Sequence, residues 1–314
     1  MPDLATLHHA ADLAAFAYQG YFDAGNEGPI SITPATLGTG AGRFEAVTLV
    51  GLAGTDIERV RDSNQAVGIR EDILAGLGSD RNAYFREAKA AILETVEPGS
   101  ALVLAGHSLG GMIAQQLAAD PELQDLYDIR HTVAFGSPLI RPGQREGQVE
   151  RLGDAGDLIP QLSLAGFVLP WWRDFGLNRE LSPYSTQGTI AAHTRSYVDP
   201  EVWGGYDAVG VRGGAASITY DPAQVRFFDA PRVPQTLEER SDRTTPEPEV
   251  LTALAASAPA LLDRLTATAP EERQALADRL QDALGPLTGA PLRSPSTPTV
   301  LAPLSERPEP TLAG

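Results

Sequence analysis

The fold is decided by the stretch Leu102-Val103-Leu104-Ala105-Gly106-His107-Ser108-Leu109-Gly110-Gly111-Met112. Its apolar start is typical of a buried strand, and a helical pattern follows the G-x-S-x-G motif of residues 106–110. In that setting the motif is a sharp turn from strand to helix with a nucleophilic serine at its apex. The glycines remove side chains that would clash, and the turn lifts the Ser108 hydroxyl, exposed, above the sheet. We therefore predict Ser108 as a nucleophile, against the alternative of a glycine-rich turn with an incidental serine.

The segments around this stretch alternate between two periodicities. Short apolar runs typical of strands occupy residues 44–52, 101–105 and 132–135, and apolar residues recur at helical spacing in residues 4–18, 82–96 and 112–119. Strands and helices in alternation predict an α/β fold, with a mostly parallel central sheet that helices cover on both faces.

Aromatic side chains indicate where the main domain ends. The 9 Phe, 3 Trp and 8 Tyr all lie at or before Phe228. Because a core of any size uses aromatic side chains, we expect one domain over residues 1–230. Residues 231–249, rich in Pro, Thr, Glu and Arg, are predicted to be a linker. Two amphipathic helices are predicted within residues 250–284, and a Pro-rich, disordered tail over residues 285–314.

Charge and composition exclude several function classes. The chain has 41 acidic and 24 basic residues and a net charge of −17, so no nucleic-acid partner is expected. It has no cysteine, and no metal-ligating pattern stands out, so we expect neither a metal nor a cofactor. No apolar run is long enough for a transmembrane segment. The amino terminus lacks the pattern of a Sec signal peptide, so we expect a protein that is cytoplasmic at synthesis, with non-Sec export left open.

A serine hydroxyl is a poor nucleophile unless a base takes its proton. The candidate bases are the five histidines His8, His9, His107, His131 and His193. Only His193 lies beyond every predicted strand, which suits the chain order nucleophile, acid, base of folds with this turn. The acid is then expected between Ser108 and His193. Asp154 and Asp157 both follow a predicted strand there, and the local pattern does not choose between them.

An oxyanion formed on the substrate needs donors. The backbone N–H of Leu109 is one candidate, because it opens the helix after the nucleophile. The second donor is expected at the end of a strand early in the chain, where Thr55 follows an apolar strand and Gly54. The alternative for Thr55 is a simple turn with a threonine that caps a helix.

Together these motifs resemble the class 3 lipases, the fungal-type triacylglycerol lipase family, whose members have the αβ-hydrolase fold. The similar segments are residues 52–55, 106–111, 134–138 and 156–160, followed by His193 with Tyr197, within roughly residues 5–200. The resemblance implies that Asp157 is the acid, since the family's aspartate stands two apolar residues before a proline. Ala53 stands where many members carry an arginine, so contacts near the substrate are expected to differ.

Two apolar stretches are candidates for contact with a lipid substrate or, transiently, with a lipid interface. Residues 65–78 lie where members of that family carry a lid, and residues 162–175 include Phe167, Trp171 and Trp172. His107, next to the nucleophile, is a further candidate substrate contact. The alternative for both stretches is packing against the rest of the protein.

The sequence therefore predicts a serine carboxylic-ester hydrolase, a lipase or phospholipase/esterase, in which Ser108, His193 and Asp157 form a triad and an acyl-enzyme. An acyltransferase or polyester hydrolase would use the same triad. A lipase-fold binding protein or exported effector is the alternative from another class.

Overall fold

The computed structural model describes residues 3–21, 28–40, 42–54, 82–141, 144–161 and 176–230. The predicted lid at residues 65–78 and the predicted linker, paired helices and tail of residues 231–314 lie outside these ranges.

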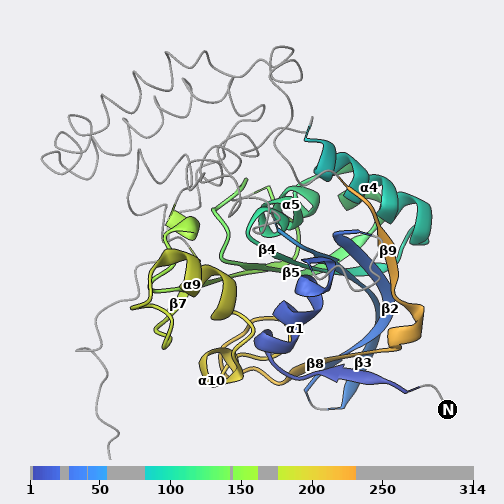
Figure 1. The fold of residues 1–314 in the computed structure, drawn as a ribbon. Helices are drawn as coiled ribbons and strands as arrows, with labels where there is room; N and C mark the ends of the chain where they lie inside the picture. The colour runs from blue at the N-terminus through green and yellow to red at the C-terminus, as the bar shows by residue number, and fades with distance from the viewer. Residues whose placement is uncertain are drawn as a thin grey trace, which may run out of the picture.

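One sheet organises the described residues (Figure 1). Its nine strands are β1 (Ala5–Leu7), β2 (Ile30–Thr39), β3 (Arg43–Leu52), β4 (Ala101–His107), β5 (Asp128–Phe135), β6 (Gln148–Asp154), β7 (Leu177–Glu180), β8 (Ala216–Tyr220) and β9 (Arg226–Phe228). The α-helices are α1 (Ala10–Ala17), α4 (Ala83–Thr95), α5 (Leu109–Ala118), α6 (Pro121–Leu126), α9 (Thr189–Arg195) and α10 (Pro200–Trp203). Three short 3₁₀ turns complete the described elements: η1 (Tyr18–Tyr21), η2 (Ile159–Gln161) and η3 (Pro222–Gln224).

The strands follow the order β1-β8-β2-β3-β4-β5-β6-β7, and β9 also pairs with β2. The five strands from β3 to β7 are parallel to their neighbours. β2 pairs antiparallel with β3, β8 and β9, and β1 pairs antiparallel with β8. The prediction of a mixed α/β fold with a mostly parallel central sheet flanked by helices is therefore confirmed.

Alternation along the parallel strands produces two cores, one on each face of the sheet. Val103 in β4 and Val133 in β5 pack in the core that contains α1 and Trp203 of α10. Leu102 and Leu104, the neighbours of Val103, pack in the core formed with α4, α5 and α6. The molecule thus has three layers, with α1 and α10 on one side of the sheet and α4 and α5 on the other (Figure 1).

The register brings the carboxyl ends of the parallel strands to one edge. Leu52 at the end of β3 lies opposite Gly106, and His107 at the end of β4 lies opposite Phe135. Phe135, the last residue of β5, lies opposite Leu152 in β6. Loops that follow these strands therefore meet at one place, which is where open α/β sheets bind ligands.

The predicted helix over residues 4–18 is wrong in its first part. Residues Ala5–Leu7 form β1, which pairs with β8, and the helix begins only at Ala10. Asp12 explains the late start, since its carboxylate accepts hydrogen bonds from the backbone N–H groups of His8 and His9 and closes the first turn. The helix predicted over residues 82–96 is confirmed as α4, which Asn82 caps through the N–H of Tyr84.

Candidate active site

Ser108 stands between β4 and α5 in a conformation that non-glycine residues rarely adopt. Its φ and ψ are 54° and −120°, and its N–H donates to the carbonyl of Phe135 at 2.9 Å. A Cβ at position 106 would lie 2.3 Å from the Gly110 oxygen, and one at position 110 would lie 2.1 Å from the Leu52 oxygen. Both glycines are therefore required by close backbone approach, and the predicted sharp turn is present. Such strain persists only where the surroundings fix it, and it concentrates at functional sites.

Ser108 is not exposed, contrary to the expectation from its turn. Only 3% of the residue is accessible to solvent. The turn lies between the ends of two neighbouring strands: the carbonyl of Leu52 in β3 approaches Gly110, and Phe135 of β5 holds the Ser108 N–H. The motif predicts the backbone conformation, whereas the burial of the serine depends on what the fold places around the turn.

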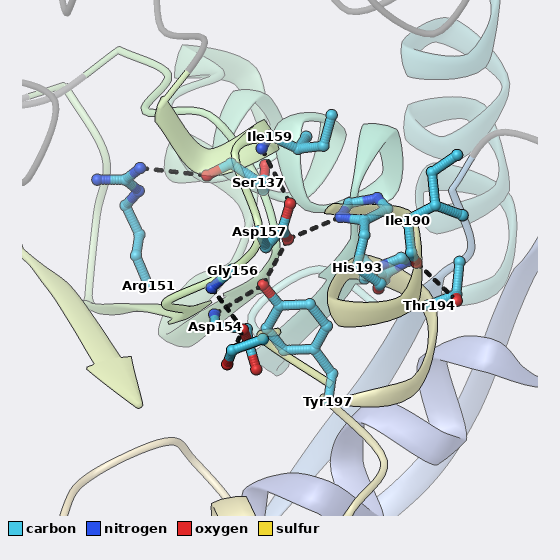
Figure 2. A network of polar contacts seen from close by, with 12 residues as sticks. Ser137, Arg151, Asp154, Gly156, Asp157, Ile159, Ile190, His193, Thr194 and Tyr197 are labelled. Atoms are coloured by element: carbon cyan, nitrogen blue, oxygen red, sulfur yellow. Dashed lines mark hydrogen bonds and ion pairs between the residues drawn. The ribbon is translucent and has the colours of Figure 1, made fainter. Parts of the chain in front are cut away.

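His193 and Asp157 form a buried pair at the same edge of the sheet (Figure 2). Nδ1 of His193 lies 2.7 Å from Oδ2 of Asp157, and the two residues are 4% and 1% exposed. A carboxylate can only accept a hydrogen bond, so Nδ1 carries the proton. In the neutral imidazole Nε2 is then left with a lone pair, which is the form that a general base requires.

The Asp157 carboxylate accepts three hydrogen bonds from described groups. Besides His193 Nδ1–H, these come from the Tyr197 hydroxyl to Oδ2 at 2.6 Å and from the Ile159 N–H to Oδ1 at 2.9 Å. Burial and then the neighbouring Asp157 carboxylate raise the pKa of Tyr197 well above its usual value, so the phenol stays protonated as a donor. The carboxylate is thereby held in place from three directions, as Figure 2 shows.

The second candidate acid, Asp154, has a different set of contacts. Its Oδ1 accepts the Gly156 N–H and the Ser185 hydroxyl, each at 2.7 Å. Its backbone N–H donates to the Tyr197 oxygen at 3.1 Å. Asp154 therefore shapes the turn that carries Asp157, and the residue that contacts His193 is Asp157.

Gly136 connects this pair to the turn that holds Ser108. It follows Phe135, the residue that binds the Ser108 N–H, and has φ of 56°. A Cβ at this position would lie 3.0 Å from both His193 Nδ1 and Asp157 Oδ2. The absence of a side chain is thus what allows the histidine–aspartate pair to lie against the end of β5. Between Ser108 and His193 themselves, the structure has no hydrogen bond; contacts of this kind are often long without substrate.

Of the two predicted oxyanion donors, one lies in the described residues. Leu109 is the first residue of α5, so its N–H has no partner within the helix. Thr55 lies outside the described ranges. The strand end that leads to it is fixed beside the turn, because the Tyr84 hydroxyl donates to the carbonyl of Ala53 at 2.7 Å.

The remaining residues are those predicted to contact substrate. His107, predicted as a substrate contact, is 1% exposed, and its Nε2 lies 2.9 Å from the backbone oxygen of His193. Its contact with substrate stays a prediction. Phe167, Trp171 and Trp172 lie outside the described residues.

Three further residues of the site carried no predicted role. Tyr84 had no signal in one sequence, because it acts through neighbours that only the fold brings together. Gly136, within residues 134–138, and Tyr197, after His193, did have one, since both belong to the segments that resemble the class 3 lipases.

Comparison with known proteins gives no relative, since no family model, no curated protein and no solved structure matches the chain. Within the described ranges, no three or more His, Asp or Glu side chains are grouped to hold a metal ion. In the same residues no helix has the length and apolar character to cross a membrane.

Proposed function

We propose that the protein is a serine carboxylic-ester hydrolase with Ser108 as nucleophile, His193 as base and Asp157 as acid. The observation that carries the proposal is the arrangement at one sheet edge. A strained serine at the start of a helix directly follows His107, whose ring centroid lies 4.4 Å from that of His193, and Nδ1–H of His193 is held by a buried carboxylate. This combination is used for acyl transfer on several unrelated folds. The similarity of the motifs to class 3 lipases supports the same proposal.

In the first half of the reaction Ser108 Oγ attacks the ester carbonyl carbon, and its proton passes to Nε2 of His193. Asp157 stabilises the imidazolium that forms. The carbonyl oxygen becomes an oxyanion, for which the Leu109 N–H is the proposed donor, with Thr55 as the second. Collapse of this intermediate expels the alcohol, which takes the proton from Nε2 and leaves an acyl-serine. A water molecule then repeats the sequence and releases the carboxylic acid.

Exposed apolar side chains around the pair favour a lipid ester as the substrate class. Leu158 follows Asp157, Leu181 follows β7, and Ile190 lies in α9 ahead of His193; they are 54%, 76% and 57% exposed. They are three of the six large apolar side chains that are exposed among the described residues. Exposed apolar side chains on the segments that carry the proposed acid and base are suited to contact with an apolar ligand or surface.

The catalytic proposal is tested by hydrolysis of a panel of acyl esters of different chain length. We expect Ser108→Ala to retain about a thousandth of wild-type activity or less, because only the oxyanion hole and substrate binding would still assist the reaction. Ser137→Ala is the matched control, because Ser137 is also buried at this sheet edge but bonds Gln115 and has no proposed role. Equal activity of the two variants would show that Ser108 is not the nucleophile.

The lipid part of the proposal is tested with the same ester in soluble and emulsified form. We expect Leu181→Ser to lose activity several-fold on the emulsion and to keep it on the soluble ester. Phe44→Ser is the control, since Phe44 is 75% exposed but lies at the start of β3, at the opposite end of the sheet. A loss that is the same for both variants would argue against a lipid-facing edge.

A further inference from the structure

His107 contacts the backbone of the proposed base near the end of α9. The last four carbonyls of a helix have no partner within it, and His193 is among the last residues of α9. The carbonyl of Ala192 is taken by the Ser196 N–H, while that of His193 faces His107 Nε2 at 2.9 Å. The Tyr18 hydroxyl lies 3.4 Å from the same oxygen. The His193 carbonyl is thus bound by side chains instead of by the next turn.

The bond defines the state of the His107 ring. A carbonyl oxygen only accepts, so Nε2 must carry the proton. Burial, and then the neighbouring His193, lower the pKa of His107 well below its usual value, so its ring stays neutral. The rings of His107 and His193 have their centroids 4.4 Å apart. A neutral neighbour adds no repulsion when His193 becomes an imidazolium during the reaction.

Among the described residues, the titratable groups around His193 come from four places in the chain. They are Asp157 after β6, His107 in β4, Tyr18 in η1, and Tyr197 after α9. Asp157 and Tyr197 hold its ring from the Nδ1 side, whereas His107 and Tyr18 hold its backbone. Ring and main chain are therefore fixed by separate groups.

We propose that His107 is a positioning residue: its Nε2–H fixes the backbone of His193 and so sets the base against the nucleophile that follows His107 in the chain. The inference rests on the proposed function. His107 is the last residue of β4 and Ser108 is the next residue, so the His107 hydrogen bond joins the strand that leads to the nucleophile to the helix that carries the base. This proposed role of His107 is distinct from the substrate contact expected from the sequence.

The test compares two substitutions of His107 by side-chain amides of different length. The side-chain nitrogen of His107→Gln extends as far as Nε2, whereas that of His107→Asn stops near the position of Nδ1. We expect His107→Asn to lower kcat roughly 10- to 100-fold, the scale of a misplacement of about 1 Å, with KM little changed. His107→Gln is expected to remain within about threefold of wild type in kcat.

A spectroscopic readout separates this inference from the proposed function. The proton on His193 Nδ1, bonded to Asp157, is expected to give a downfield NMR resonance that His193→Ala removes. It should persist in the Gln variant and be lost or broadened in the Asn variant, whether or not any ester is hydrolysed. If wild type hydrolyses no ester, the proposed function fails and the resonance alone decides the role of His107.

Several results would overturn the inference. One is an Asn variant that keeps both kcat and the resonance. Another is a rise in KM in both variants with kcat unchanged, which would make His107 a substrate contact. A Gln variant that folds but lacks the resonance and the activity would also overturn it, and this outcome is decisive even if the Asn variant does not fold.

Discussion

Removing the Tyr197 hydroxyl affects both the Asp157 carboxylate and the turn at Asp154. The loss of stability can be worked out from the two hydrogen bonds that disappear. In Tyr197→Phe the Asp157 carboxylate loses its 2.6 Å donor, and the Asp154 N–H loses its acceptor. A bond to a charged group contributes about 1.5–3 kcal/mol, and an unsatisfied buried N–H costs about 1–3 kcal/mol. We expect the free energy of unfolding to fall by about 3 kcal/mol, which lowers Tm by roughly 6–12 °C in a domain of this size.

The same change affects catalysis through the proposed acid. Without the phenol, the Asp157 carboxylate beside His193 has one hydrogen-bond donor fewer. Asp157 keeps the Ile159 and His193 donors, so the loss of kcat should be about tenfold or less.

The assay is steady-state kinetics on a soluble ester, with thermal unfolding followed by circular dichroism. Tyr127→Phe is the matched control, since the buried Tyr127 hydroxyl donates at 3.0 Å to the Val96 carbonyl, away from the site. It should cost about 1 kcal/mol and leave kcat unchanged. The reasoning is refuted if the Tyr197 variant changes neither Tm nor kcat more than this control does.

Two other changes test the neighbours of His193. Asp157→Asn should lower turnover by roughly four orders of magnitude, because the amide no longer holds Nδ1–H, whereas Asp154→Asn should lose less than about tenfold. Steady-state kinetics on folded variants measure both, and the reverse ranking would move the acid to Asp154. Gly136→Ala places a Cβ 3.0 Å from Asp157 Oδ2 and should lower kcat/KM about 100-fold. Gly99→Ala, also at positive φ but with nothing within 4 Å, should lose stability without loss of activity; equal activity of the two alanine variants would show that the site tolerates the added atom.

The parallel part of the fold could be predicted because its residues follow strong local patterns. Residues 101–105 are uniformly apolar, as a strand buried on both faces requires, and all of β4 is buried. The antiparallel part of the sheet could not be predicted in this way. β2 contains Pro34 and Gly38, which disfavour a strand locally, and it forms because β3 pairs with it along ten residues.

The candidate site was predictable where the proposed chemistry needs a fixed residue type at a fixed place. The proposal of Ser108 as nucleophile follows from its turn, and that of His193 as base follows from chain order and elimination. The choice between Asp154 and Asp157 depended on the family resemblance, since Asp154 ends β6 and Asp157 follows only three residues later. Tertiary contacts such as His107 with the His193 carbonyl join residues 86 positions apart, and no local pattern indicates them.

The central claim, that Ser108 is an activated nucleophile, is tested most directly by reaction with a fluorophosphonate followed by peptide mapping. Attack of Ser108 Oγ on phosphorus expels fluoride and leaves a stable phosphonyl-serine, a step that needs the base but no particular acyl group. We expect the label on the peptide that contains Ser108 in wild type, and no label in Ser108→Ala or His193→Ala. Labelling at another residue, or an unreactive wild-type protein that is folded, would contradict the account.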